Sequence, residues 1–454
     1  MKKELFSNEI TILRDTFRRL LRRRAKTNII KLIDKTHPAD LALLFRYFNE
    51  NEQDEIFNDL KPSADTAEFL NELDESISIR LLENESPERI AQILEYASSN
   101  EQAHLMGLVD DKYASSVIDL LKAEKQEELE EMMAYPEDSA GILMYTDVFT
   151  LHEDTKAKDA IYALQDQEDA EMVFYLYTLD DDGRLTGVIS LRDLVTTSGD
   201  TMLKDIMSKQ IHVVRPETDQ EEVARIVSQY NFLAVPVVDS DDHLLGIVTV
   251  EDVVDIIREE ATEDFLQMVG AGKDREILLK SSWENARMRV PWLFASWVGG
   301  ILAVFIIGVF DNVLQSTIAL AAFIPVIMGM GGNIGTQSST MIVRGLATGR
   351  VSIENSVKIL FKEIRVGLLL GILYGLLLGL FAIFQFIDAS PMIGIVVGLS
   401  ICISMIIAAT IGSLVPLILN RFEIDPAIAT GPFVTTAIDI IGVAFYFIVA
   451  GVFL

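Results

Sequence analysis

The sequence predicts a multidomain chain: an α-helical solenoid, an α/β module built from two repeats, a connecting helix and a five-helix transmembrane domain. The 454 residues are too many for one hydrophobic core. Half of them are hydrophobic, yet the net charge is −30. Residues 1–290 hold 32 Lys and Arg against 61 Asp and Glu, whereas residues 291–454 hold 6 against 7. We therefore expect an acidic part outside a membrane and an apolar part within it.

Residues 1–135 are expected to form the helical N-terminal domain. The segments HPADLALLF, KPSADTAEFL, SPERIAQIL and DDKYASSVIDLL each open an apolar helical pattern, at a spacing of about 25 residues. Pro38, Pro62 and Pro87 mark similar places in three of them, and proline is favoured in the first helical turn. Such a repeat indicates stacked helix pairs.

Two features bear on the compartment of this acidic part. The N-terminus has no apolar stretch of the secretory type, and its first 26 residues hold nine basic ones. They predict an exposed basic helix, or alternatively a contact with anionic lipid or the acidic domains. Cys402 is the single cysteine, so an intrachain disulfide is excluded. We expect the acidic part to lie in the cytosol and to bind no nucleic acid.

Residues 136–260 contain a second repeat. Phe174–Val195 and Ala234–Val254 each have a β run, an acidic turn, a second β run with Gly, and a Ser or Thr followed three residues later by Asp. This resembles a pair of CBS motifs, which form one α/β module, are commonly regulatory and often bind adenine nucleotides. By that resemblance Thr249 and Asp252 match nucleotide-contacting positions, so ATP or AMP is an expected ligand. The alternative is that both residues only cap a helix.

The segment EDVVDIIREEATEDF, Glu251 to Phe265, holds seven acidic residues and one Arg. On a helix, Asp252, Asp255 and Glu259 share one face, and Glu260, Glu263 and Asp264 fall on a neighbouring one. Like charges at these spacings repel, and a divalent cation such as Mg²⁺ or Ca²⁺ would relieve the repulsion. Residues 261–290 are expected to form a connecting helix that carries force from this cluster to the membrane.

The last domain, 291–454, contains five segments long and apolar enough to span a membrane, at 291–310, 317–343, 366–386, 392–419 and 426–453. Lys and Arg stay on the cytoplasmic side of membrane proteins. The first and third connections have no basic residue, whereas basic residues precede the first span and occupy the second and fourth connections. We expect a multi-pass protein of the cell membrane with a cytoplasmic N-terminus and its C-terminus outside.

The second span carries the polar segment PVIMGMGGNIGTQSST, Pro325–Thr340. Asn333, Thr336, Gln337 and Thr340 recur every three to four residues, which places them on one helical face. Polar residues within a span usually face a bundle interior or a water-filled path, although small ones also serve helix packing. The four glycines and Pro325 permit a bent or locally unwound helix whose carbonyls face such a path.

The last span carries Asp439, in PFVTTAIDIIG. We expect it to lie about halfway along the span and to be the only acidic residue well inside one. A carboxylate there is costly unless it is protonated or a cation accompanies it. Thr435 and Thr436, one turn earlier, are expected to line the same path. The alternative is a protonated or water-solvated Asp at a helix contact.

With YPEDSAGILM at Tyr135–Met144 and the two membrane motifs, the order of domains resembles the MgtE family of bacterial magnesium channels over essentially the whole chain. The resemblance implies a homodimer with a pore between the two membrane domains. It also implies that cytosolic Mg²⁺ closes the pore by bridging acidic surfaces of the cytoplasmic domains and the connecting helix.

By this resemblance Asp439 matches the pore carboxylate. The sensor positions near the connecting helix match Asp252, Asp255, Glu260, Glu263 and Asp264, and further sensor contacts match Asp425, Glu221 and Gly141. Asn231 stands where a sensor Asp is expected, so the sensor affinity is open. Asp110 and Asp111 are the candidates in the helical domain.

We therefore expect a Mg²⁺ channel or transporter rather than an enzyme, with Mg²⁺ as substrate and regulator, in contact with membrane lipid. The pore-lining residues are predicted to be Asn333, Gln337, Thr340, Thr435 and Thr436. The alternative is a divalent cation transporter of broader selectivity that ATP or AMP regulates. A membrane enzyme is disfavoured because the spans lack a nucleophile–base pair or a His/Cys metal site. An acidic pore residue argues against an anion channel.

Overall fold

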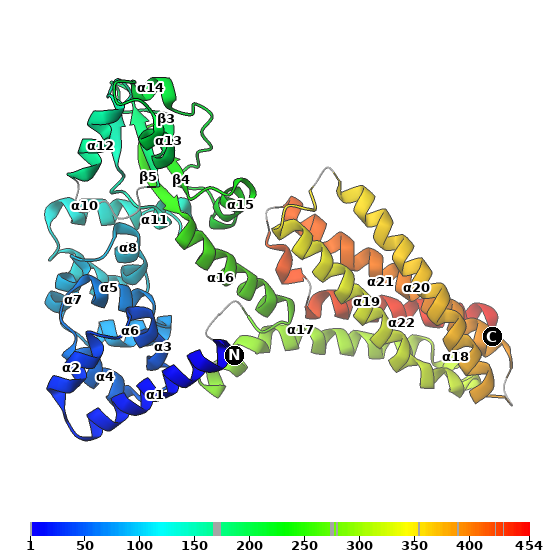
Figure 1. Cartoon of the computed structure of the whole chain (residues 1–454). Coiled ribbons are helices and arrows are strands. Elements are labelled where there is room, and N and C mark those ends of the chain that lie inside the picture. Colours follow the sequence, from blue (N-terminus) through cyan, green and yellow to red (C-terminus); the bar gives the residue numbers. More distant parts are fainter. Residues whose placement is uncertain are drawn as a thin grey trace. The chain divides into compact units, whose positions relative to one another are not determined.

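The computed structural model describes residues 2–166, 174–272, 277, 280–352, 355–387, 390–422, 424–429 and 431–454 (Figure 1). The chain folds as two compact units, Met1–Ile257 and Arg258–Leu454. Each is described by itself below.

Helices α1 to α10 form the helical part of the first unit. Within it, α3 packs on α5, α5 on α7 and α7 on α9, which confirms the predicted stack of helical repeats. Pro38 and Pro87 occupy the first turn of α3 and α7, whereas Pro62 lies two residues before α5. The helices are α1 Lys2–Arg22, α2 Lys26–Ile33, α3 Pro38–Phe45, α4 Glu50–Asp59, α5 Ala64–Asn71, α6 Glu75–Glu83, α7 Pro87–Leu94, α8 Ser99–Gly107, α9 Asp111–Ile118 and α10 Ala123–Met132.

The basic helix α1 is anchored to this stack rather than free of it. Phe17 is fully buried and Leu21 nearly so. Arg18 donates a hydrogen bond of 2.5 Å to the carbonyl oxygen of Tyr47. The apolar face of α1 therefore belongs to the core of the helical domain.

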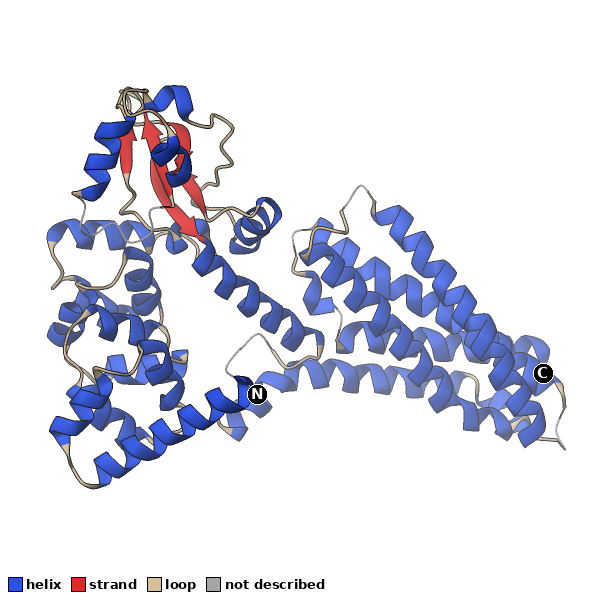
Figure 2. Ribbon diagram, in the orientation of Figure 1, coloured by secondary structure: helices blue, strands red, loops and turns tan. Residues whose placement is uncertain are grey.

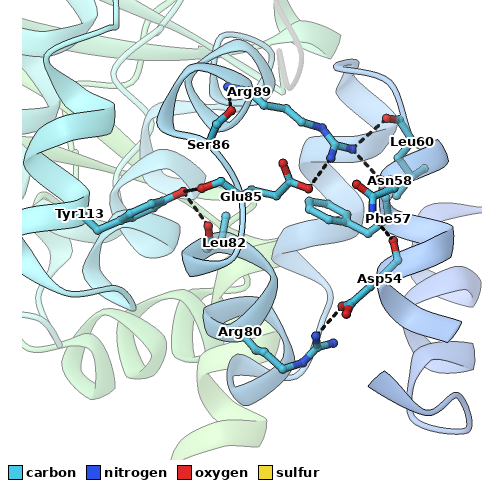
Figure 3. Close-up of polar contacts among 10 residues, drawn as sticks. All are labelled: Asp54, Phe57, Asn58, Leu60, Arg80, Leu82, Glu85, Ser86, Arg89 and Tyr113. Carbon is cyan, nitrogen blue, oxygen red and sulfur yellow. Dashed lines mark hydrogen bonds and ion pairs between the residues drawn. The ribbon is translucent and has the colours of Figure 1, made fainter. Parts of the chain in front are cut away.

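Polar side chains connect successive repeats of the stack (Figure 3). The Arg89 guanidinium contacts Glu85 Oε1 at 2.6 Å and donates to the carbonyl oxygens of Phe57 and Leu60 at 2.6 and 3.1 Å. The hydroxyl of Tyr113 donates to the Leu82 carbonyl oxygen at 2.6 Å. These bonds satisfy carbonyls at helix ends, which have no partner within their own helix.

The strands lie in the α/β module that follows (Figure 2). In the first repeat β1 (Thr150–His152) pairs in parallel with β2 (Tyr175–Leu179), which is antiparallel to β3 (Leu185–Ser190). In the second, β4 (Ala234–Val238) is antiparallel to β5 (Leu244–Thr249). The helices are α11 Ala140–Leu143, α12 Ala157–Gln165, α13 Leu191–Thr196, α14 Leu203–Ile206 and α15 Gln220–Tyr230.

The two repeats share a topology, as the sequence predicted. Each hairpin shifts register near the end of its first strand, at Thr178/Leu179 and at Val237/Val238. In the place that β1 holds in the first repeat, the second repeat has only a single parallel bridge, between Val214 and Val237. The module is therefore an imperfect internal duplication.

The acidic segment forms α16, Val250–Met268. We expected a connecting helix over residues 261–290, and the structure differs. After Met268 the chain turns through Gly270 and Gly272, whose φ angles of 70° and 101° glycine adopts readily. The next helix, α17, begins at Ser282 with a capping box to Glu284 and carries Arg287 and Arg289 into the first span. Residues 273–276, 278 and 279 of the expected helix lie outside the described residues.

Among the described residues of the second unit, five helices are long and apolar enough to cross a membrane, in agreement with the predicted number of spans. Helix α21 packs on α19, α20 and α22, and α17 packs on α22. The elements are α17 Ser282–Val309, α18 Asp311–Ser316, the 3₁₀ turn η1 Ile318–Phe323, α19 Ile324–Ala347, α20 Ser356–Gln385, α21 Met392–Arg421, the 3₁₀ turn η2 Pro426–Ala429 and α22 Pro432–Phe453.

The polar segment of α19 does not unwind. It is α-helical throughout, with Pro325 in its first turn, and a 3₁₀ turn precedes it at Ile318–Phe323. Gly335 serves close packing instead. A Cβ on Gly335 would overlap Cδ1 of Ile438, and one on Gly412 would overlap the carbonyl oxygen of Gly335.

Candidate functional site

Asp439 projects from α22 within the membrane unit. The helix begins at Pro432, after the N-cap Gly431, so Asp439 is its eighth residue and lies in its first half rather than at mid-span as expected. The side chain is half-buried, and Oδ1 is buried without a hydrogen-bond partner among the described residues. That oxygen lies 3.8 Å from where a Cβ on Gly332 would stand. The absence of a side chain at Gly332 therefore leaves room beside the carboxylate.

The polar residues of α19 divide between two faces. Asn333, Gln337 and Thr340 are exposed in the single chain, whereas Ser338 and Ser339 are buried. Because the exposed residues lie four and three positions apart, they form one stripe along the helix. Two amide side chains on the surface of a membrane helix are unfavourable in contact with lipid. This stripe is therefore expected to face water or another protein chain.

Thr435 and Thr436 differ in their surroundings. The hydroxyl of Thr435 donates to the carbonyl oxygens of Gly431 and Pro432 at 3.4 and 3.2 Å, within its own helix. Thr436 packs its methyl group against Gly299 of α17, where a Cβ would overlap that methyl group. The structure thus brings Asp439 next to α19 and turns Thr436 toward α17.

A second acidic site lies where α16 ends. Gln267 is 1% exposed, and its Nε2 donates to Asp425 Oδ2 at 2.8 Å and to Glu263 Oε1 at 3.0 Å. Asp425 Oδ1 accepts from the Ala427 backbone N–H at 2.8 Å, which fixes the start of η2. Burial, and then the negative charge of Asp425, raise the pKa of Asp264 to about 6. The positive charge of Arg344 lowers the pKa of Asp264 in part, and a bound cation would favour the ionised carboxylates further.

This junction also packs closely. A Cβ on Gly431 would lie 3.1 Å from the carbonyl oxygen of Met268, and one on Gly270 would lie 3.0 Å from Cδ of Pro432. Trp292 meets Phe433 edge to face at 5.5 Å between ring centroids. The end of α16 is therefore seated directly on the start of α22, the helix that carries Asp439.

Asp252 and Asp255 of α16 belong to the first unit. Asp252 Oδ2 bonds to the hydroxyl and backbone N–H of Thr249, and its Oδ1 accepts from Asn100 Nδ2 at 3.2 Å. Burial raises the pKa of Asp252 to about 6. Asp255 is exposed and Glu260 is half-buried. Thr249 and Asp252 thus form the helix cap that we weighed as an alternative.

Two other predicted positions come together in the first unit. Gly141 donates its backbone N–H to the Pro216 carbonyl oxygen at 2.8 Å, and Ser139 pairs with Asp219, which caps the helix that begins with Gln220 and Glu221. Asn231, where a sensor Asp was expected, ends the same helix in the left-handed conformation at φ 55°. Asn tolerates this conformation well.

The two candidate metal ligands of the helical domain lie at the start of α9. Asp110 is the N-cap of α9, where its side chain accepts from the Lys112 backbone N–H at 3.3 Å, and Asp111 opens the helix. Within the described residues, no three His, Cys, Asp or Glu side chains are grouped so as to hold a metal ion. The predicted sensor residues are thus spread over several elements.

Sequence reasoning missed a buried carboxylate near the start of the third membrane helix. Glu363 is the eighth residue of α20, before the predicted span at 366–386, and its buried Oε2 accepts from Ser338 Oγ at 2.9 Å. Lys362 and Arg365 flank it, and the segment resembles a basic connection. One signal was present: Glu363 lies four residues before Gly367, which begins a run of glycines with the same spacing.

Comparisons with known proteins bear on this arrangement. Family models match residues 36–138 as an MgtE intracellular N domain, 140–199 and 203–259 as CBS domains, and 324–449 as a divalent cation transporter of the MgtE type. The magnesium transporter MgtE of Bacillus subtilis is 31% identical over 424 residues, 93% of each chain. The chain belongs to the MgtE family.

Other MgtE relatives agree with this. The magnesium transporter MgtE of Thermus thermophilus is 35% identical over 426 residues, which cover 92% of this chain and 94% of that one. A crystal structure of the cytosolic domain of the Mg²⁺ channel MgtE in complex with ATP is 33% identical, with a TM-score of 0.51, over 54% of this chain and 99% of that one. With its five apolar helices, this MgtE-family chain is a multi-pass membrane protein.

Proposed function

We propose that this protein carries Mg²⁺ into the cell through a pore formed by two copies of the chain and closes when cytosolic Mg²⁺ rises. The observation that carries the proposal is Asp439, a half-buried carboxylate in a membrane helix with one oxygen unpartnered in the described chain. It lies beside Gly332 on the helix that exposes Asn333 and Gln337. The relatives that cover nearly the whole chain are magnesium transporters.

The residues suit a hydrated Mg²⁺ ion as the transported substrate. Mg²⁺ dehydrates reluctantly and keeps several waters. A path for it needs few direct ligands, with acceptors for the hydrogen atoms of its water shell. Asp439 from each copy supplies charge, and the oxygens of Asn333, Gln337 and Thr340 supply neutral acceptors. A second copy facing this stripe removes it from lipid, which supports a homodimer with the path between the copies.

Closing follows from the junction of α16 and α22. A cation at Asp264 and Asp425 offsets their repulsion and holds the end of α16 against the start of α22. Mg²⁺ favours whichever state it binds more tightly. We propose the same role for Asp252, Asp255, Glu260, Glu263, Glu221 and Gly141. This requires the acidic part to be cytoplasmic, with the C-terminus outside, as the Lys and Arg pattern predicts.

Mg²⁺ uptake into liposomes tests the pore. Asp439→Asn is expected to reduce the flux at least about 100-fold, because the hydrated cation loses the negative charge that offsets its own within the membrane. The control is Asp311→Asn, which removes an exposed carboxylate in the α17–α19 connection. Equal fluxes from wild type and Asp439→Asn would refute the pore assignment.

Inhibition by Mg²⁺ on the cytoplasmic side tests the sensor. The double variant Asp264→Asn, Asp425→Asn is expected to stay open at Mg²⁺ concentrations that close the wild type. Asp205→Asn, an exposed carboxylate of α14, is the control. An unchanged inhibition curve in the double variant would mean that these carboxylates do not sense the ion.

A second candidate function is regulation by adenine nucleotides. It is favoured by the Thr249–Asp252 pair and by the relative solved with ATP. Calorimetry of the full-length protein is expected to show ATP or AMP binding that Thr249→Ala abolishes. Ser190→Ala is the matched control, since Ser190 and Asp193 form the equivalent pair in the first repeat at 2.7 Å. No heat of binding in the wild type would eliminate this function and leave the pore unaffected.

A further inference from the structure

We propose that Glu363 is a positioning residue for ion transport: by holding Ser338, it fixes the direction in which the polar stripe of α19 points. The inference rests on the proposed function, since the stripe of Asn333, Gln337 and Thr340 is the proposed wall of the path. It assigns a role to a carboxylate that the proposed path does not use.

The position of Glu363 is costly for a carboxylate. Its side chain is 5% exposed, whereas its neighbours Lys362 and Arg365 are exposed. The hydroxyl of Ser338, itself 2% exposed, donates to Glu363 Oε2 at 2.9 Å. Acidic residues within membrane bundles are rare because of their desolvation cost, and those present usually serve the transport path or its architecture.

Glu363 lies at the end of a regular packing surface. Gly367, Gly371, Gly375 and Gly379 follow it at intervals of four and face α21. A Cβ on Gly375 would lie 2.5 Å from the Gly398 carbonyl oxygen, so the two backbones are nearly in contact there. Glu363 continues this face by one turn but carries a long side chain. That side chain reaches α19, which packs chiefly on α21 and α22, and so bridges two helices that contact each other little.

The hydrogen bond between Ser338 and Glu363 reaches α19 next to the polar stripe. Ser338 directly follows Gln337, so the two side chains point about 100° apart around the helix. Close packing at Gly331 and Gly335 holds α19 against α21 and α22, and none of these contacts reaches α20. The hydrogen bond from Ser338 to Glu363 adds a hold on the buried face from a third helix, and thereby helps to fix where the exposed face points.

Mg²⁺ flux per correctly folded protein is the first test. Glu363→Ala and Ser338→Ala are each expected to lower the flux about tenfold, with no further loss in the double variant, because both remove one bond. Glu363→Gln, which keeps an acceptor oxygen of the same reach, is expected to retain most of it. Lys362→Ala is the control. Wild-type flux in Glu363→Ala, or losses that multiply in the double variant, would overturn the proposal.

A second measurement reports which face of α19 is accessible to water, and it does not depend on ion transport. In a Cys402→Ala background, a water-soluble thiol reagent is expected to modify Gln337→Cys quickly and Ile342→Cys, on the buried face, slowly. Adding Glu363→Ala is expected to slow the first reaction and speed the second. Unchanged rates would overturn the proposal. If the wild type carried no Mg²⁺, the proposed function would fail while these rates would still report on the bridge.

Discussion

Gly412 brings the backbones of α21 and α19 into contact. A Cβ at this position would overlap the Gly335 carbonyl oxygen and lie 3.0 Å from the Gly335 Cα, and this backbone has no side chain to move aside. Gly412→Ala is therefore expected to destabilise the protein by about 1–3 kcal/mol.

Thermal unfolding in detergent measures this effect. Gly308→Ala in α17 is the matched control, because nothing lies within 4 Å of a Cβ built there. We expect a clear loss of stability for Gly412→Ala and almost none for Gly308→Ala. Similar melting temperatures for both would show that α19 and α21 do not meet so closely.

Arg89 joins two helices of the solenoid. From α7 it bonds the carbonyl oxygens of Phe57 and Leu60 near the end of α4, and its guanidinium lies 4.7 Å from the centre of the Phe57 ring. Its side chain is 19% exposed. Arg89→Ala removes the side-chain donor to the Leu60 carbonyl oxygen and leaves the Phe57 carbonyl oxygen only the Leu60 backbone N–H, so we expect it to cost about 1–3 kcal/mol.

Backbone hydrogen exchange in α4 and α7 measures the stability lost in Arg89→Ala. The control is Arg46→Ala, which removes a two-point ion pair to Asp74 from an arginine that is 51% exposed. Exposed pairs contribute little, at most about 1 kcal/mol. Faster exchange in Arg89→Ala alone is expected, and equal exchange in both variants would contradict the role of Arg89 at the end of α4.

Gln267 makes a polar contact between α16 and the segment before α22. Gln267→Leu keeps the approximate volume but removes the donor to Asp425 and Glu263. A hydrogen bond to a charged group is worth about 1.5–3 kcal/mol, so the Mg²⁺ concentration for half-inhibition is expected to rise about tenfold or more.

The control for this junction is Thr262→Ala on the same helix, whose hydroxyl bonds only the Arg258 carbonyl oxygen among the described residues. Mg²⁺-inhibition curves of the two variants are compared at equal flux in low Mg²⁺. If Mg²⁺ inhibits Gln267→Leu at the wild-type concentration, the junction does not carry the regulatory signal.

The elements show what sequence patterns specify and what they miss. Hydropathy predicted five spans, and the internal repeats predicted the helical stack and the paired hairpins, because each reflects a local apolar period. The glycines of α19 permitted either unwinding or helix packing, and the helix does not unwind. The packing role of Gly335 depends on Ile438 and Gly412, which lie far away in the sequence, and no local pattern records such partners.

The candidate site was predictable only in part. Asp439 stands out because it is acidic within an apolar run, and the structure sets it beside Gly332. Gln267 and Glu363 carry no such signal: each has charged residues close by in the sequence and acquires its place through burial against another element. The domain limits and the roles of the site residues stay predictions.

Over the whole molecule, the acidic excess of residues 1–290 predicts a specific response to divalent cations. Mg²⁺ at millimolar concentration is expected to protect the full-length protein from limited proteolysis, because binding to the closed state lowers the population of open forms. EDTA is expected to reverse the protection. NaCl at matched ionic strength is the control, since simple screening acts through ionic strength alone. Equal protection by NaCl would mean that screening, not binding, brings the acidic surfaces together.

The unequal lengths of the membrane helices have a consequence for the host bilayer. At 1.5 Å per residue, α20 and α21, with 30 residues each, are about 45 Å long, whereas α22, with 22, is about 33 Å. A hydrocarbon core is about 30 Å thick, so the long helices must tilt or protrude while α22 just spans it. A thicker membrane therefore strains the helix of Asp439 first. We therefore expect that lengthening the lipid chains lowers the Mg²⁺ flux at a thickness where the thermal stability of the protein is still unchanged.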